Sequence, residues 1–336
     1  MNFKAPNLPP TRIAVLSGGN SFEREISLQS GKAITRALME RGHSVTSIDP
    51  ASEDLTTYDF NEIDVAFIAL HGSFGEDGQV QEILADAKVP YTGSDAESSR
   101  RAFSKSAAKE RFGIAGVPTP DYALFNHADN IDDIHRMAES IGYPLVVKPD
   151  KQGSSIGVTI VETSEGLDSA VLSCLQFDRH GILEAAIVGA EWTVGLFDTE
   201  AFPPIHIATP RGFFDYKAKY HDEATEYDFD AELPQGVAQQ LAAISRAACQ
   251  SLGVSGITRV DLRVDSTLRP WVLEVNTIPG FTDHSLIPKA AAEVGLSLTD
   301  VAEIAVAGCM PTKPPLKGPH FLRRSAVAKV KSEDPA

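Results

Sequence analysis

Two stretches, TRVDLRV at residues 258–264 and WVLEVN at residues 271–276, have the residue pattern of neighbouring β-strands. Successive side chains on a strand point to opposite faces. The first stretch is therefore predicted to place Arg259, Asp261 and Arg263 on one face and its aliphatic residues on the other.

The same alternation predicts the faces of the second strand. Val272, Glu274 and Asn276 should share one face, opposite Leu273 and Val275. The intervening residues, DSTLRP, are rich in turn formers, so the two strands are expected to form a β-hairpin.

Pairing across this hairpin would bring acidic side chains together. If the two ends of the turn at 265–270 pair with each other, Asp261 lies opposite Glu274, and Arg259 lies opposite Asn276. Facing carboxylates repel unless a cation separates them, and carboxylate and amide oxygens are ligands that suit Mg²⁺. The alternative is a hairpin whose charges merely face water. The tight turn NTIPG, which follows at once, weakens that alternative.

The N-terminal part has the pattern of an α/β unit. Strand, helix, strand in this order favours a parallel sheet with ligand-binding groups at the carboxyl ends of its strands. Segments 17–21 and 71–78 would lie at those ends. The predicted elements are strands at 12–17, 44–48 and 64–70 and a helix at 27–41.

The rest of the chain alternates helices with short strands, and we place approximate domain boundaries near residues 95 and 185. The elements expected there are helices at 98–112, 129–141 and 237–252 and strands at 144–148, 157–161 and 181–184. Residues 311–336 are rich in proline and lysine and lack a sustained period, which is typical of a flexible basic tail.

Composition excludes several classes of protein. The 336 residues carry 46 acidic against 30 basic side chains, a formal net charge of −16, which disfavours nonspecific binding to a nucleic-acid backbone. The three cysteines form no CxxC pair, so a disulfide framework or zinc site is not expected. Apolar runs stay short of the roughly 20 residues of a membrane span, and no signal peptide is evident. These features predict a cytoplasmic protein that binds neither nucleic acid nor membrane.

Two segments could bind a phosphorylated ligand. The loop at 153–157, GSSIG, offers backbone N–H groups and hydroxyls, and Lys148 ends the apolar strand before it. A common Gly/Ser hairpin loop with a snorkelling lysine is the alternative. The loop FDYKAKYH at 214–221 presents Lys219 and Tyr220, or is simply an ordinary mobile loop.

The familiar nucleotide-binding motifs are absent. Gly31-Lys32 lacks the upstream glycine of a P-loop, and no GxGxxG follows the first strand, so any nucleotide must bind in another way. His71 follows the third strand, where it is either a ligand-facing residue or a strand-end histidine with satisfied hydrogen bonds.

Taken together and in order, the motifs resemble those of D-alanine–D-alanine ligases of the ATP-grasp superfamily, from about residue 12 to residue 307. They are GGNSFEREISL at 18–28, ALHGSFGEDG at 69–78, PYTGS at 90–94, VVKPDKQGSSIGV at 146–158, FDYKAKY at 214–220, RVD at 259–261 and LEVNTIPGFTDHSLIP at 273–288. The resemblance implies an ATP-grasp architecture that combines α/β and α+β parts. Its implied domains are an N-terminal α/β substrate-binding domain (1–95), a central ATP-grasp domain (96–185), a C-terminal ATP-grasp catalytic domain (186–310) and the tail (311–336).

The resemblance also implies an ATP-dependent, ADP-forming ligase that joins two D-alanines through a D-alanyl phosphate for peptidoglycan precursors, and a homodimer. The implied catalytic residues are Glu23, Ser154, Tyr220, Arg259, Gly280 and Ser285, with His71 and Leu286 binding substrate. The implied ATP-binding residues are Lys105, Lys148, Glu184, Ala185, Ile187, Glu191, Phe213, Lys219 and Leu273. Asp261, Glu274 and Asn276 would hold two Mg²⁺ (or Mn²⁺) ions.

Three positions depart from the family pattern. Ser104 stands where an acidic residue often precedes the lysine, Glu184-Ala185-Ala186 replaces a Glu-Lys-aromatic segment, and Phe281 replaces a common methionine. Other interpretations are an ATP-grasp ligase for another carboxylate and amine, a ligase that joins D-alanine to D-lactate, or a silent ATP-binding homologue. Tyr220 favours dipeptide formation, since phenylalanine there accompanies D-lactate.

Overall fold

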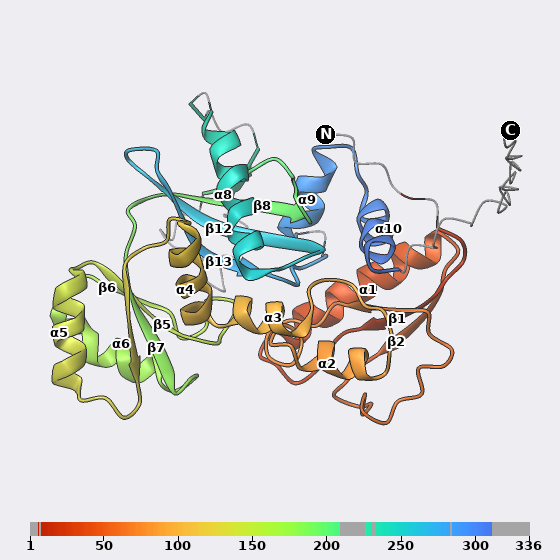
Figure 1. Ribbon diagram of the computed structural model, residues 1–336, viewed down its shortest axis with the longest axis horizontal. Coiled ribbons are helices and arrows are strands. Elements are labelled where there is room, and N and C mark those ends of the chain that lie inside the picture. The colour runs from red at the N-terminus through yellow and green to blue at the C-terminus, as the bar shows by residue number, and fades with distance from the viewer. Residues whose placement is uncertain are drawn as a thin grey trace, which may run out of the picture.

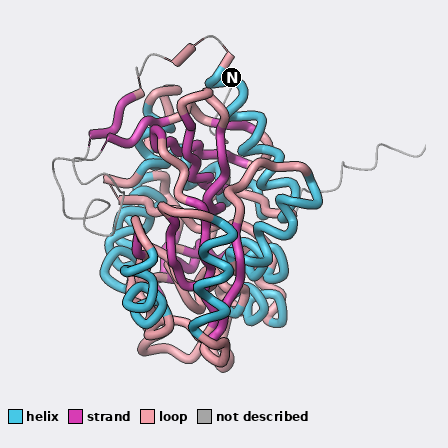
Figure 2. Tube along the Cα trace, turned by 90° about the vertical axis from the view of Figure 1, so that its left-hand side faces the viewer, coloured by secondary structure: helices cyan, strands magenta, loops and turns pink. Residues whose placement is uncertain are grey.

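The computed structural model describes residue 6 and residues 8–208, 226–229, 233–234, 236–282 and 284–310. These residues form three separate β-sheets with helices packed against them, an N-terminal sheet at the right of Figure 1, a central one at the left and a C-terminal one above. Seen from the side, the strands run through the middle of the molecule and helices flank them (Figure 2).

The N-terminal sheet is parallel, as predicted. Its three strands, in the order β2-β1-β3, are β1 (Arg12–Leu16), β2 (Ser44–Ile48) and β3 (Val65–Ile68). Helix α1 (Arg24–Glu40) connects β1 to β2, starting three residues before the predicted helix. Helices α2 (Gln79–Asp86) and α3 (Ala96–Phe103) follow. Apolar residues of β1 and β3 are completely buried, since parallel strands are covered on both faces.

A glycine turn carries the chain from β1 toward α1. Gly18 and Gly19 both have positive φ, +93° and +72°, and a Cβ on Gly18 would lie 2.5 Å from the carboxylate of Asp49. The Asp49 carboxylate accepts from Gly19 N–H at 2.9 Å and from the Arg24 guanidinium at 2.7 Å. This network fixes the turn that leads directly to Glu23.

The central sheet is antiparallel, in the order β4-β7-β5-β6. Its strands are β4 (Tyr122–Asn126), β5 (Leu145–Pro149), β6 (Thr159–Val161) and β7 (His180–Ala185), and its helices are α5 (Ile131–Ile141), the short 3₁₀ helix η1 (Ser164–Gly166) and α6 (Leu167–Cys174). Helix α4 (Lys105–Ala115) precedes them in the chain and packs its apolar face in the core of the C-terminal sheet. The predicted helical stretch at 98–112 is two helices, α3 and α4. Ser104 separates them because its extended backbone ends α3 while its hydroxyl caps α4.

The C-terminal sheet is also antiparallel. Its main path is β11-β10-β8-β12-β13, with β9 paired to β8. The strands are β8 (Gly189–Phe197), β9 (Glu200–Ala201), β10 (Ile205–Ala208), β11 (Glu226–Asp228), β12 (Ile257–Asp265) and β13 (Pro270–Asn276). Helix α8 (Val237–Leu252), which the sequence predicts with these bounds, buries its apolar face against this sheet.

The predicted hairpin pairing is confirmed at the acidic positions. Asp261 pairs with Glu274, and Arg259 pairs with Asn276. Beyond Asp261 the register shifts by one residue, and Leu273 is the extra residue of a β-bulge. The predicted pairing at the turn is wrong, since it is Val264 and not Asp265 that lies opposite Pro270.

The bulge also overturns the predicted faces of β13. Val272 is completely buried in the core beneath the sheet, whereas Leu273 and Glu274 both line a cleft on the other side. Strict alternation would have put Val272 and Glu274 together. A bulge restarts the alternation because it inserts one residue into one strand only.

The last two helices return to the N-terminal sheet. Helices α9 (Leu286–Ala292) and α10 (Leu298–Cys309) share an apolar core with β1, β3 and α1, and α10 lies against α1 (Figure 1). Arg41 at the end of α1 forms an ion pair with Asp300 of α10 at 2.5 Å. Within the described residues, no helix combines the length and apolar character needed to cross a bilayer.

The glycine turn should make stability depend on pH. The Arg24 guanidinium, and to a smaller extent the Gly19 N–H, lower the pKa of Asp49 from 3.8 to about 2 against the opposing effect of burial. Because the folded pKa is the lower one, this stabilisation is present above 3.8 and is lost as the pH falls toward 2. Urea unfolding of Asp49→Asn should therefore show a loss at neutral pH that shrinks on acidification. A loss independent of pH would contradict the assignment.

Candidate active site

A cleft of about 320 Å³ lies between the central and C-terminal sheets. Its walls come from β5, β6 and β7 on one side and from β8, β12 and β13 on the other. The lining residues include Lys105, Lys148, Glu184, Ala185, Ile187, Glu191, Asp261, Leu273 and Glu274, which are nine of the predicted nucleotide and metal residues. The floor is mixed, with aliphatic side chains such as Val146 and Ile160 beside the charged groups.

A smaller cavity, of about 50 Å³, adjoins this cleft. Lys105, Gln152 and Glu274 line both spaces, so the two adjoin at those side chains. The predicted substrate-side residues that line the small cavity are Glu23, His71, Ser154, Arg259, Asn276 and Gly280. Side chains from all three sheets therefore converge where the cleft meets the cavity.

Glu184, at the end of β7, is a fully buried carboxylate. Lys148 of β5 donates to it at 2.7 Å, and Lys109 of α4 forms an ion pair with its other oxygen at 2.5 Å. Burial opposes ionisation of Glu184, but the two ammonium groups outweigh it and keep its pKa below the ordinary value. Burial lowers the pKa of Lys109 to about 8. The sequence analysis placed Lys148 and Glu184 in the same site but missed their direct contact.

Lys105 opens α4 and reaches into the junction of cleft and cavity. Its ammonium donates to the Gln152 carbonyl at 2.5 Å and lies 3.8 Å from the Glu274 carboxylate. The capping residue Ser104 also donates to Asp150 at 2.9 Å. The serine at this position thus takes part in anchoring the start of the helix, although an acidic residue is more usual there.

Arg259 and Asp261 form a two-pronged ion pair along β12. The two N–H···O distances are 2.9 and 2.8 Å, and Thr193 of β8 donates to the same carboxylate at 2.7 Å. They meet because residues two apart on a strand share a face. Their side chains are only 12% and 8% exposed, so the arginine balances a nearly buried charge.

Glu274 and Asn276 complete the oxygen donors of the hairpin. Glu274 has a side chain that is 31% exposed to the cleft. The side-chain oxygen of Asn276 accepts from the Ile278 N–H at 2.9 Å, which orients the amide and leaves the oxygen a second lone pair. Two carboxylates and an amide oxygen on neighbouring strands fit the hard-oxygen chemistry of a divalent cation such as Mg²⁺.

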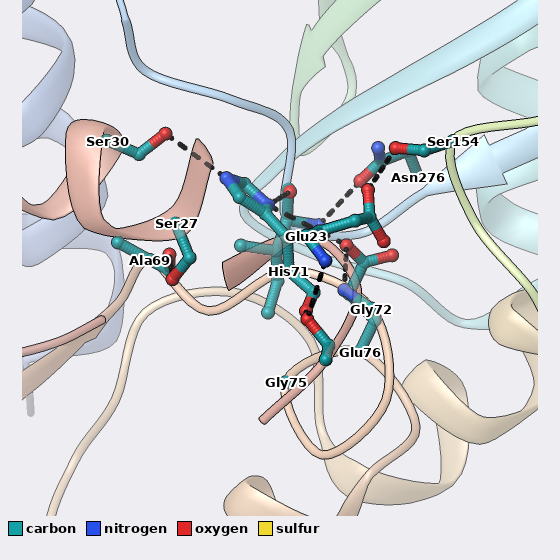
Figure 3. Close-up of polar contacts among 12 residues, drawn as sticks. Glu23, Ser27, Ser30, Ala69, His71, Gly72, Gly75, Glu76, Ser154 and Asn276 are labelled. Atoms are coloured by element: carbon teal, nitrogen blue, oxygen red, sulfur yellow. Dashed lines mark hydrogen bonds and ion pairs between the residues drawn. The ribbon is translucent and has the colours of Figure 1, made fainter. Parts of the chain in front are cut away.

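Glu23 lies in the small cavity opposite the hairpin. Its carboxylate accepts a hydrogen bond from the Ser154 hydroxyl, which joins the start of α1 to the 153–157 loop (Figure 3). A Cβ on Gly72 or on Gly153 would lie 2.7 Å from the same carboxylate. Only glycine therefore allows both backbones to approach Glu23 so closely.

His71 is held in one orientation by two hydrogen bonds. Its Nδ1 lies 3.0 Å from the Ile278 carbonyl, which can only accept, so Nδ1 carries the proton. Its Nε2 lies 3.1 Å from the Ser30 hydroxyl of α1 (Figure 3). The sequence left His71 as either a ligand-facing residue or a strand-end histidine with satisfied hydrogen bonds. In the structure its hydrogen bonds are satisfied and it also lines the small cavity.

The turn after β13 brings Gly280 against Ser285. A Cβ on Gly280 would lie 2.6 Å from the Ser285 hydroxyl, which accepts from Thr282 N–H at 3.0 Å. Leu286 has its side chain buried in the core shared by α1 and α9, so any contact with substrate falls to its backbone. Phe281 is buried edge-on against Phe67 of β3.

Glu191 of β8 is held by an ion pair with Arg263 of β12 at 2.9 Å. Phe213, Lys219 and Tyr220 lie outside the described residues. Three residues of the site were not predicted from the sequence: Lys109, Thr193 and Gln152. Lys109 had a usable signal, because it lies one helical turn after Lys105, but a lysine at that spacing is usually solvent-exposed.

Two family models match the chain. Residues 49–94 match the family described as D-ala D-ala ligase N-terminus, and residues 112–306 match D-ala D-ala ligase C-terminus. The chain belongs to the D-alanine–D-alanine ligase family. It is 41% identical over 285 residues to a D-alanine–D-alanine ligase of Ectopseudomonas mendocina (strain ymp), covering 85% of this chain and 90% of that one.

Solved ligases share its fold. The D-alanine–D-alanine ligase of Bacillus anthracis complexed with ATP superposes with a TM-score of 0.77 at 31% identity, covering 89% of this chain and 97% of that one. The VanG D-Ala:D-Ser ligase of Enterococcus faecalis gives 0.78 at 27% identity, covering 89% and 99%. The ATP-grasp fold expected from the sequence is thereby confirmed for this member of the ligase family.

The buried carboxylate of this ligase should be needed for folding. Glu184→Gln leaves Lys109 and Lys148 facing each other without a counter-charge, which should cost about 3–5 kcal/mol in urea unfolding. The matched control is Glu162→Gln, an exposed residue of the same cleft, which should change stability little. Adding Lys109→Met to Glu184→Gln should recover part of the loss. Additive losses in the double variant would contradict the charge-pair explanation.

Proposed function

We propose that this chain is an ATP-dependent, ADP-forming D-alanine–D-alanine ligase that makes D-alanyl-D-alanine for peptidoglycan precursors. The observation that carries the proposal is the junction at Lys105, Gln152 and Glu274, where the cleft adjoins a small polar cavity. A terminal phosphate held in the cleft would there lie next to a substrate held in the cavity, as phosphoryl transfer requires. Family membership supplies the substrates.

We assign the cleft to ATP. Aliphatic side chains and the backbone at Ala185 and Ile187 border the base, Glu191 takes the ribose, and Lys105 and Lys148 meet the phosphates. Leu273 joins this wall because the bulge turns it into the cleft. Phe213 and Lys219 are proposed for the same site on the resemblance alone.

We assign the small cavity to D-alanine. Glu23, braced by Ser154, accepts from the ammonium of the first D-alanine, and His71 lies beside it. Ser285 and the backbone of Leu286 bind the carboxylate of the second. Tyr220 closes the site in this scheme.

The hairpin oxygens would hold two Mg²⁺ or Mn²⁺ ions. Asp261, Glu274 and Asn276 fit them in donor type, and Asp261 and Glu274 face the phosphate end of the cleft. When bound, such ions neutralise phosphate charge and favour transfer of the terminal phosphoryl group.

The protein groups account for the rest of the reaction. Lysines position ATP while the carboxylate of the first D-alanine attacks its terminal phosphate, giving an acyl phosphate and ADP. The amine of the second D-alanine then attacks the acyl carbon and gives up a proton, which the departing phosphate can take. Arg259 and the Gly280 N–H stabilise the oxyanion, and phosphate departs as the dipeptide forms. The 153–157 loop covers the acyl phosphate, which water would otherwise hydrolyse.

The first test is turnover itself. Incubation with ATP, Mg²⁺ and D-alanine should release ADP, phosphate and D-alanyl-D-alanine in equal amounts. D-lactate and D-serine should be tried as second substrates, since a D-Ala:D-Ser ligase shares the fold. Turnover only with another carboxylate or amine would replace the proposal by a different ATP-grasp ligase. ATP binding without any turnover would indicate a silent homologue.

Glu274→Gln tests the metal assignment. The change keeps the shape of a side chain that is partly exposed and whose nearest cation, Lys105, is 3.8 Å away, so stability should barely change. Turnover should fall roughly 100-fold or more, and Mn²⁺ binding in the presence of ATP, followed by electron paramagnetic resonance, should weaken. Glu162→Gln serves as the control. Unaltered Mn²⁺ binding would remove Glu274 from the metal site.

We also propose that the ligase acts as a cytoplasmic homodimer. The sequence features support the compartment and the family resemblance supports the dimer. Analytical ultracentrifugation would reveal a monomer if the second part is wrong.

A further inference from the structure

Phe22 is a large apolar side chain that lies mostly in solvent. It is 69% exposed, although it directly precedes the buried Glu23. A single exposed apolar side chain is ordinary, so what distinguishes Phe22 is the contact that its ring makes.

The Phe22 ring meets Phe177, which follows α6 in the central part of the chain. The ring centroids are 6.1 Å apart and the planes are inclined at 78°, an edge-to-face pair. Residue 22 belongs to the N-terminal α/β part and residue 177 to the central one, so the pair bridges two parts that carry separate sheets.

Phe177 also holds both ends of the 153–157 loop. A Cβ on Gly157 would lie 2.7 Å from its ring, so the ring packs directly on the backbone where the loop ends. Its carbonyl accepts from the Gln152 side chain at 3.3 Å, where the loop begins. Gln152 in turn borders both cleft and cavity.

The loop itself has a backbone that needs external support. Ser154 and Ser155 have φ of +51° and +58°, a region that costs a non-glycine residue free energy unless surrounding contacts compensate. Ser154 has one such contact in Glu23. The pair of Phe22 and Phe177 supplies another supporting contact, and Phe22 directly precedes Glu23 in the chain.

We propose that Phe22 is a positioning residue for the ligase reaction: through Phe177 it holds the 153–157 loop closed over Glu23 and the small cavity. The role in catalysis rests on the proposed function, whereas the effect on the loop does not. Phe22 touches no reacting atom in this scheme. It acts by keeping the loop's N–H groups and Ser154 in place and water out.

Hydrogen–deuterium exchange tests the structural half without any substrate. Ile156 N–H bonds the Gly153 carbonyl at 3.1 Å and closes the turn that holds Ser154 and Ser155 at positive φ, so its exchange reports whether this turn unfolds when contacts outside it are lost. An edge-to-face pair corresponds to roughly two- to tenfold in an opening equilibrium. Phe22→Ala should accelerate exchange in peptides covering 150–158 by that factor and lower the melting temperature by only a few degrees. Unchanged exchange in this segment would overturn the proposal.

Steady-state kinetics test the catalytic half. Phe22→Ala should raise the KM for D-alanine and release phosphate in excess of dipeptide, because a loop that opens admits water to the acyl phosphate. Phe22→Tyr, which keeps the ring, should restore tight coupling. Met39→Ala is the matched control, an exposed apolar residue at the other end of α1. Tight coupling in Phe22→Ala despite faster loop exchange would refute the catalytic role.

A double-variant cycle separates the pair from two independent effects. In a Phe177→Ala background, Phe22→Ala should have little further effect on loop exchange or phosphate excess. Full additivity would overturn the proposed route through Phe177. If the unaltered protein makes no dipeptide, the proposed function fails, and the exchange experiment still decides whether Phe22 holds the loop.

Discussion

In the β12–β13 hairpin, the extra residue Leu273 restarts the alternation of side chains along β13. This shift decides which side chains of β13 enter the core and which face the cleft. Val272 and Val275 both enter the core below, while Leu273 and Glu274 both face the cleft above. Without the bulge, strict alternation would let only one of Leu273 and Glu274 face the cleft. The pairing of Asp261 with Glu274 survives because the bulge begins just beyond it.

Charge burial is the second constraint on this cleft. The three most buried acidic groups that line it are each matched by a basic group: Glu184 by Lys109 and Lys148, Asp261 by Arg259 and Glu191 by Arg263. The matching fixes side chains that would otherwise have many rotamers, so that the proposed ligands are held in place before substrate arrives. It also keeps the region near neutrality within a strongly acidic chain.

The reaction proposed here needs all three sheets at one point. Glu23 and His71 come from the N-terminal part, Ser154 and Lys148 from the central sheet, and Arg259 from the C-terminal sheet. The link between Glu23 and Ser154 and the neighbouring aromatic pair join the first two of these parts. The return of α9 and α10 to the N-terminal core joins the first to the third.

The sequence by itself determined the family, the parallel N-terminal sheet, the bounds of α8 and the facing of Asp261 and Glu274, because these depend on local periodicity and on ordered motifs. It did not determine the bulge in β13, because local periodicity predicts strict alternation. The extra residue depends on the packing of Val272 into the core and of Leu273 into the cleft. Nor did the sequence determine the contact of Lys109 with Glu184, or of Phe22 with Phe177. The members of each pair are far apart in the chain, and only tertiary packing brings them together. The division of the chain at 95 and 185 and the individual site roles stay predictions.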